Sequence, residues 1–163
     1  MLYLFDMRKL KLYLETSVWN FYFADDAPEK KEITLKFFNQ VKQGEYEIFI
    51  SDIVFSEIAA ASDEKNAQLS ELITEYQPKE LYVNDDVLLL AEKYIQEGAL
   101  PERAEFDSKH VAIATFYEID ALISWNLKHL ANFKRMEKIN SVNLKEGYLK
   151  RLELMTPMEV SNG

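Results

Sequence analysis

Short apolar runs alternate with helix-patterned segments along nearly the whole chain, and this order limits the possible folds more than any other feature. Strands that are separated by helices pair in parallel through crossover connections. The sequence therefore predicts a three-layer α/β/α sandwich with a mainly parallel central sheet, formed by residues 1–163 as one domain. The expected strands are 10–15, 46–51, 80–83, 120–125 and 151–157, and the expected helices are 29–44, 51–62, 63–76, 85–98, 101–118 and all or the later part of 126–140.

Spacing and capping signals support the helical segments. In 29–44, Ile33, Phe37 and Val41 recur at intervals of four residues, which places them on one face of a helix, and Gly44 is expected to end it. The helix after the second strand follows directly, with Ser51 or Asp52 as the predicted N-cap.

The residue types present exclude several kinds of site. The chain has no cysteine and only two histidines, His110 and His129. A disulfide scaffold, a thiolate nucleophile, a cysteine-ligated zinc site and a histidine-rich metal site are therefore excluded. Any metal ion would be held mainly by oxygen atoms, which favours a hard cation such as Mg²⁺ or Mn²⁺.

The charge of the chain limits its partners and its location. The formal net charge is −9, so binding of nucleic acid would need a local basic patch or a bridging cation. The first residues are apolar only in patches, because Asp6, Arg8, Lys9 and Lys11 interrupt them. This pattern fits neither a signal peptide nor a membrane span, so we expect a cytoplasmic protein without membrane contact. Residues 1–8 are a candidate non-essential extension.

Three acids and one amide fall at positions where a parallel sheet forms binding sites. Glu15 ends the first expected strand, Glu57 lies on the helix that leaves the second, Asp107 lies near the start of the helix before the fourth, and Asn126 follows the fourth. In open α/β sheets, ligands bind beyond the carboxyl ends of the strands. The order of elements therefore predicts that these four side chains meet at one edge.

Each of these residues also has a structural interpretation. Glu15 can be a solvated strand end, Asp107 can favour the dipole of its own helix, and Asn126 can be an N-cap. Glu57 can be an exposed helix residue beside a buried face of Val54, Phe55 and Ile58. A histidine such as His110 is more often packed or hydrogen-bonded than a metal ligand, and the aromatic run at 19–23 is typical of a core or an interface.

The combination of motifs resembles a known family. The pieces "YLETSVWN", "SDIVFSEI", "DSKHVAIAT" and "DALISWNLKHLAN", with the tail "INSVNLKEGY…LELMTPMEV", resemble PIN domains, and among them the VapC-like toxins of toxin–antitoxin pairs. The resemblance implies a metal site formed by Glu15, Glu57 and Asp107, with Asn126 at the fourth catalytic position. It further implies that Thr16, Ser17 and Ser124 are hydroxyl residues around that site.

The resemblance implies a function and two departures from the family pattern. The implied activity is hydrolysis of RNA phosphodiester bonds with Mg²⁺ or Mn²⁺, by a protein that is often a homodimer and is neutralised by a small antitoxin. Glu15 stands where the family usually has Asp, and Asn126 stands where it commonly has a fourth acid. The cluster then carries three formal charges, and repulsion among them is expected to raise the pKa of some of the acids.

A local basic segment is a candidate contact for the RNA backbone. It follows the proposed fourth site residue and consists of Lys128, His129, Lys134, Arg135 and Lys138. A solvated helix face explains the same charges.

Three functions remain open. The first is a metal-dependent endoribonuclease, and the second is a catalytically weakened PIN-fold module that binds RNA or a protein without cleavage. The third, a doubly wound ligand-binding or phosphate-transfer domain, is weak because the four glycines form no glycine-rich loop.

Overall fold

The central sheet has five strands, all parallel, in the order β3-β2-β1-β4-β5. It is seen in a computed structural model that describes residues 8–126 and 133–162. The predicted three-layer α/β/α architecture is confirmed. The strands are β1 (Leu10–Leu14), β2 (Tyr46–Ser51), β3 (Lys79–Leu81), β4 (Ala121–Ile123) and β5 (Glu153–Met155).

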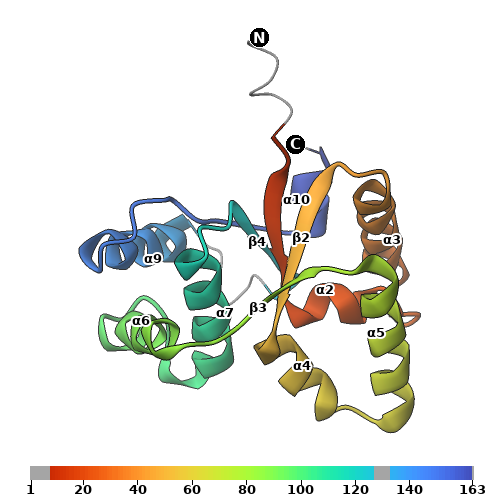
Figure 1. Ribbon diagram of the computed structural model, residues 1–163, viewed down its shortest axis with the longest axis horizontal. Coiled ribbons are helices and arrows are strands. Elements are labelled where there is room, and N and C mark those ends of the chain that lie inside the picture. The colour runs from red at the N-terminus through yellow and green to blue at the C-terminus, as the bar shows by residue number, and fades with distance from the viewer. Residues whose placement is uncertain (1–7, 127–132, 163) are drawn as a thin grey trace.

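Helices cover both faces of this sheet. Figure 1 shows α2, α3 and α5 on one side of it and α6, α7 and α9 on the other, with α4 near the carboxyl ends of the strands. The helical elements are α2 (Thr16–Phe21), α3 (Pro28–Lys42), α4 (Asp52–Ala59), α5 (Asp63–Tyr76), α6 (Asp85–Gln96), the 3-10 turn η1 (Glu102–Ala104), α7 (Glu105–Phe116), α9 (Phe133–Lys145) and α10 (Pro157–Asn162).

The predicted elements agree with the observed ones, with three differences. Two helices of six residues each, α2 and α10, were not predicted, because segments this short carry no clear periodicity. The helix predicted over 101–118 begins with the turn η1, and α7 proper starts at Glu105. The helix predicted over 126–140 corresponds to α9, which ends at Lys145 and so continues past the predicted end. Its predicted start includes 127–132, which lie outside the described residues.

The strands end together, which sets up one edge of the sheet. Leu14 of β1 pairs with Ile123 of β4, and Glu15 continues this pairing by donating its backbone N–H to the Ile123 carbonyl at 3.1 Å. On the other side of β1, β2 ends at Ser51, which pairs with Leu81 at the end of β3. Residues that follow β1, β2 and β4 therefore emerge at one side of the molecule.

Buried polar side chains connect the helices to the sheet. The Asn140 amide on α9 binds both the N–H and the C=O of Leu152, just before β5, at 2.9 and 3.1 Å. The hydroxyl of Tyr94 on α6 binds Thr115 on α7 and Asn143 on α9. All three helices of this face are thus joined by hydrogen bonds inside the core.

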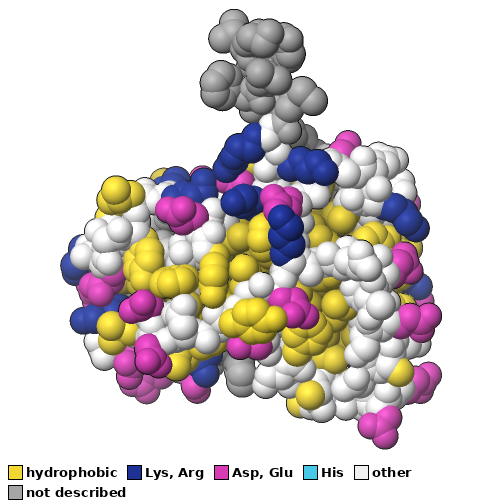
Figure 2. All heavy atoms as spheres, in the orientation of Figure 1, with side chains coloured by type: hydrophobic (Ala, Val, Ile, Leu, Met, Phe, Trp, Pro, Cys, Tyr) yellow, Lys and Arg dark blue, Asp and Glu magenta, His cyan; other side chains and the backbone are white. Residues whose placement is uncertain are grey.

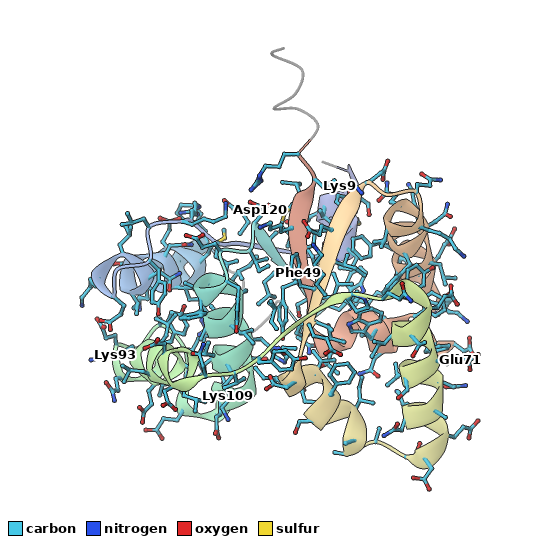
Figure 3. All side chains as sticks on the ribbon, viewed as in Figure 1. Lys9, Phe49, Glu71, Lys93, Lys109 and Asp120 are labelled. Atoms are coloured by element: carbon cyan, nitrogen blue, oxygen red, sulfur yellow. The ribbon has the colours of Figure 1, made fainter. Side chains whose placement is uncertain are left out.

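The opposite, N-terminal edge of the sheet is held by Asp120. This carboxylate accepts the Lys11 backbone N–H at 2.8 Å and forms ion pairs with Arg8 at 3.1 Å and Lys150 at 2.8 Å. Figure 3 labels Asp120 and Lys9 at this end of the sheet. Arg8 is therefore tied to the domain, although it falls within the extension predicted over residues 1–8; residues 1–7 lie outside the described residues.

We expect Asp120→Asn to lower the free energy of unfolding at pH 7 by about 1–2 kcal/mol, because hydrogen bonds to a charged group are lost. Burial raises the pKa of Asp120, but the Lys11 hydrogen bond, Lys150 and Arg8 outweigh it and hold the pKa below its usual value. A depressed folded-state pKa stabilises the protein above the unfolded-state pKa, and this contribution disappears as the pH falls through the folded-state pKa. Urea unfolding should show the difference at pH 7 and a much smaller one near pH 2.5. An equal difference at both pH values would contradict it.

Basic side chains are prominent at one end of the central sheet. Figure 2 shows Lys and Arg side chains gathered near the N-terminal edge of the sheet, at the top of the view. The predicted site lies at the other edge.

Among the described residues, no helix is both long and apolar enough to span a membrane.

Candidate functional site

Glu15 sits in a buried cluster of hydrogen-bond donors where β1 passes into α2. It is the N-cap of α2, it is only 2% exposed, and its Oε1 accepts the backbone N–H of Ser17 at 2.8 Å. The same oxygen accepts hydrogen bonds from the hydroxyls of Ser17 and, at 3.1 Å, Ser124. The interpretation of Glu15 as a solvated strand end is therefore wrong.

The two serines also fix the loop that follows β4. Ser17 Oγ accepts the backbone N–H of Trp125 at 2.8 Å, and Ser124 Oγ accepts that of Asn126 at 2.9 Å. The side-chain amide of Asn126 lies 3.4 Å from Oε2 of Glu15. The structure thus brings together Glu15, Ser17, Ser124 and Asn126, which were predicted as site residues from distant parts of the sequence.

Glu57 meets this cluster through Thr16. The Thr16 hydroxyl donates to Oε1 of Glu57 at 3.0 Å, and Nε2 of His110 lies 2.6 Å from the same oxygen. The Glu57 side chain is 28% exposed. Both of these donors bind the same carboxylate oxygen. The buried face of α4 includes Val54 and Ile58 as predicted, but Phe55 is 37% exposed.

A chain of buried hydrogen bonds continues from His110 into the sheet. The Tyr13 hydroxyl lies 2.6 Å from Nδ1 of His110 and 2.6 Å from Oγ of Ser51. Ser51 is the N-cap of α4, as predicted, and accepts the backbone N–H of Ile53. Tyr13, Ser51 and His110 are each at most 1% exposed. His110 is thus a hydrogen-bonded core histidine, as its residue type suggested.

The charge state of Glu57 follows from these contacts. Burial raises its pKa, but the hydrogen bonds from His110 and Thr16 outweigh burial and hold the pKa below the usual value. Glu57 is therefore not one of the acids whose pKa is raised in this cluster. Complete burial also raises the pKa of Tyr13 well above its usual value, so its hydroxyl stays protonated.

Asp107 is the third predicted acid, and it lies in the first turn of α7. It is partly buried and takes part in an interaction with the rest of the chain. It precedes His110 by three residues, so the two side chains lie on neighbouring parts of one helix face. The helix that carries Asp107 is therefore the one that contacts Glu57.

The chemistry of these donors suits a hard cation, but their arrangement does not form a complete site. Carboxylate and amide oxygens are the ligands that Mg²⁺ and Mn²⁺ prefer. Within residues 8–126 and 133–162, however, no three Asp, Glu or His side chains lie close enough together to hold one metal ion.

The basic segment is described only in part. Lys134, Arg135 and Lys138 lie on α9, where Lys134 and Lys138 are exposed and Arg135 is partly buried. Lys128 and His129 lie outside the described residues, as does any helix that Asn126 would cap.

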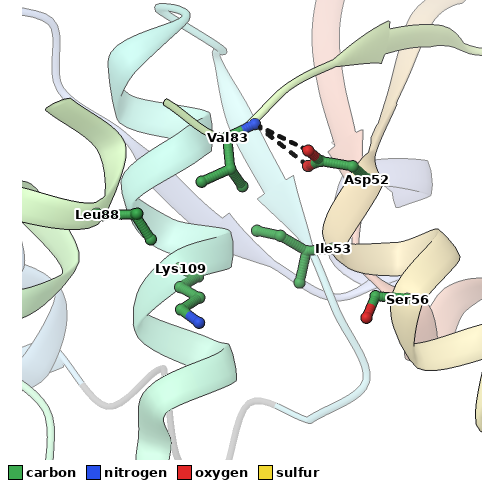
Figure 4. Close-up of a pocket in the computed structure, with 6 residues that line it drawn as sticks. All are labelled: Asp52, Ile53, Ser56, Val83, Leu88 and Lys109. Carbon is green, nitrogen blue, oxygen red and sulfur yellow. Dashed lines mark hydrogen bonds between the residues drawn. The ribbon is translucent and has the colours of Figure 1, made fainter. Parts of the chain in front are cut away.

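A pocket of about 220 Å³ opens beside α4 and α7 (Figure 4). The Asp52 carboxylate accepts the Val83 backbone N–H at its rim, at 3.2 Å to each oxygen. The pocket lies next to the predicted site, but none of the described site residues is among those that line it. Its lining consists of Asp52, Ile53, Ser56, Val83, Leu88 and Lys109.

Tyr13 and Ser51 were missed as parts of the site by reasoning from the sequence. One signal was available for Tyr13: it lies two residues before Glu15, between the apolar residues Leu12 and Leu14. A buried tyrosine needs a partner for its hydroxyl. No sequence signal identifies Ser51 or His110 as that partner.

Comparisons with known proteins assign neither a family nor a function to the chain. No model of a known protein family matches the chain, and no curated protein sequence matches it. The resemblance to PIN domains therefore depends on the motifs quoted above, and function has to be argued from the site.

Proposed function

We propose that this protein is a metal-dependent endoribonuclease of the PIN/VapC type that hydrolyses RNA phosphodiester bonds. The observation that carries the proposal is that Thr16, the residue after Glu15, donates its hydroxyl to Glu57 on α4, so the chain segments that carry the two acids are joined at the carboxyl edge of a parallel sheet. Sites of α/β proteins lie at this edge. Asp107 and Asn126, from α7 and from the end of β4, complete the set that the PIN resemblance implies.

Each residue has a distinct role in this proposal. Glu15, Glu57 and Asp107 would hold Mg²⁺ or Mn²⁺, while Asn126 and Ser124 orient the Glu15 carboxylate. The cation, when bound, makes hydroxide available near neutral pH and neutralises charge on the phosphate. Because Oε1 of Glu57 is occupied by Thr16 and His110, its Oε2 is the oxygen left to bind.

A cleavage assay tests the proposal. Single-stranded RNA is incubated with the protein and Mn²⁺, then with Mg²⁺, then with excess EDTA. Cleavage is expected with either ion and not with EDTA. Cleavage that continues in EDTA would point to a contaminating or metal-independent nuclease, and no cleavage with either ion would overturn the proposal.

A second candidate is a PIN-fold module that binds RNA or a protein without cutting. The observation that favours it is the saturation of Glu15: Oε1 accepts three hydrogen bonds and the residue is 2% exposed. The same assay separates the two functions, because RNA that is retained by the protein but left intact in Mn²⁺ supports the second.

In either case, α9 is the proposed contact for the phosphate backbone. Reversing two charges, Lys134→Glu with Arg135→Glu, should weaken RNA binding and lower the slope of log K against log salt by about 1.4, since each contact to a single strand contributes about 0.7. Fluorescence anisotropy between 50 and 300 mM salt measures this slope. Lys36→Glu with Lys65→Glu is the control, with the same change in net charge at exposed positions on α3 and α5. If both double variants weaken RNA binding equally, the net charge of the protein, and not a contact with α9, explains the effect.

The resemblance also suggests a homodimer and a small antitoxin as partners, located in the cytoplasm. Light scattering on the purified protein tests the dimer. Co-expression with a small DNA-binding protein encoded nearby tests the antitoxin, which should suppress RNA cleavage.

A further inference from the structure

A continuous chain of buried hydrogen bonds ends on the proposed site. It runs from Ser51 to Tyr13 at 2.6 Å, from Tyr13 to His110 at 2.6 Å, and from His110 to Oε1 of Glu57 at 2.6 Å. We call this chain of four residues the relay. Its first three members are almost completely buried, whereas Glu57 is 28% exposed, so it connects the core to the surface of the site.

The relay joins the elements that carry all three predicted acids. Tyr13 belongs to β1 and lies two residues before Glu15, which directly follows that strand. His110 belongs to α7 and lies one helical turn after Asp107. Because Glu57 itself is on α4, the relay holds β1, α4 and α7 in one fixed arrangement.

One arrangement of protons satisfies every polar atom of the relay. Nε2–H of His110 donates to the Glu57 carboxylate, and Nδ1 accepts the hydroxyl proton of Tyr13. The Tyr13 oxygen accepts the hydroxyl proton of Ser51, whose oxygen already accepts the Ile53 N–H. Buried polar groups are stable only when paired in this way, so removal of one hydroxyl disturbs its neighbours.

The relay also determines which oxygen of Glu57 is available. His110 and the Thr16 hydroxyl both bind Oε1, from α7 and α2 respectively. Two donors on one oxygen fix the plane of the carboxylate and direct Oε2 away from them. Hydrogen bonds of this kind orient metal ligands in proteins, and their loss typically lowers metal affinity about 10- to 100-fold.

We infer that Tyr13 and His110 are positioning residues, which orient the Glu57 carboxylate so that its Oε2 is presented to a divalent cation. This inference rests on the proposed function, because it assumes that Glu57 is a metal ligand. It adds that the affinity of the site for the cation depends on the Tyr13 hydroxyl, which does not contact the cation.

The test compares two tyrosines that lose the same atom. Tyr13→Phe removes the relay hydroxyl, and Tyr94→Phe removes another buried hydroxyl, which binds Thr115 and Asn143 between α6, α7 and α9. Both residues are 0% exposed. Mn²⁺ affinity of the full-length chain is measured by electron paramagnetic resonance, without RNA, so the measurement does not depend on cleavage.

We expect Tyr13→Phe to weaken Mn²⁺ binding about 10- to 100-fold and Tyr94→Phe to leave it unchanged. His110→Gln, which keeps an N–H donor near the position of Nε2, should retain more Mn²⁺ affinity than His110→Leu. This pair tests the positioning role if Tyr13→Phe does not fold.

Unchanged Mn²⁺ affinity in Tyr13→Phe and His110→Leu would overturn the inference alone, as would equal losses in both tyrosine variants. No Mn²⁺ binding by the wild-type protein would overturn the proposed function as well.

Discussion

Asp107→Asn is expected to reduce metal-dependent RNA cleavage about 100- to 1,000-fold, the usual effect of removing one group that stabilises charge in a reaction. The reason is that an uncharged amide replaces one of only three anions proposed to hold the cation. Thermal unfolding gives a second readout, because a cation that binds only the folded chain stabilises it. At a concentration of 100 times its dissociation constant, Mn²⁺ should raise the melting temperature of the wild-type protein by about 5–10 °C. Asp107→Asn should lose most of this increase.

The matched control for Asp107 is Asp86→Asn. Both residues lie in the first turn of a helix, Asp107 on α7 and Asp86 on α6. An acid at this position interacts favourably with the helix dipole, so both variants lose that contribution. Only Asp107 is expected to change cleavage and the response to Mn²⁺. If both variants show the same Mn²⁺-dependent increase as the wild-type protein, Asp107 acts only through its helix.

Glu15→Ala is expected to have the largest effect on stability among the site variants. It removes the N-cap of α2 and leaves the buried donors of Ser17 and Ser124 without their acceptor. Together these losses should lower the free energy of unfolding by about 2–4 kcal/mol and the melting temperature by about 5–15 °C. Urea unfolding at neutral pH without metal measures the change.

Glu71→Ala serves as the control for Glu15→Ala. Glu71 points outward from α5 (Figure 3), so its removal should change the free energy of unfolding by less than about 0.5 kcal/mol. Glu15→Gln keeps one acceptor oxygen in the cluster and should fall between the two. A Glu15→Ala protein as stable as Glu71→Ala would show that the carboxylate does not hold α2 and the loop after β4.

The fold was predictable because its elements follow from local patterns. The strands β1, β2 and β4 appear in the sequence as apolar runs, and α4 follows Ser51, a predicted N-cap whose side chain accepts the backbone N–H of Ile53. These signals lie within a few residues of one another. The turn η1 and the helix α2 were not predicted because they are too short for a periodic pattern.

The candidate site was predictable in its members but not in its contacts. Topology alone brings Glu15 and Ser124 to one edge, because β1 and β4 are neighbours in the sheet. A carboxylate at this edge can face solvent, cap a helix or bind a hydroxyl. Side-chain rotation and packing decide between these outcomes, and no sequence pattern predicts them. For this reason the burial of Glu15 and the partnership of Tyr13 with His110 became visible only in the structure.

One carboxylate oxygen, Oε1 of Glu57, is shared by donors from two helices, Thr16 on α2 and His110 on α7. When two groups support the same atom, the loss of either leaves the other in place, so their energetic contributions do not simply add. A double-mutant cycle between them should give a coupling energy of about 0.5–3 kcal/mol. Scanning these residues one at a time would consequently misjudge how much each of them matters.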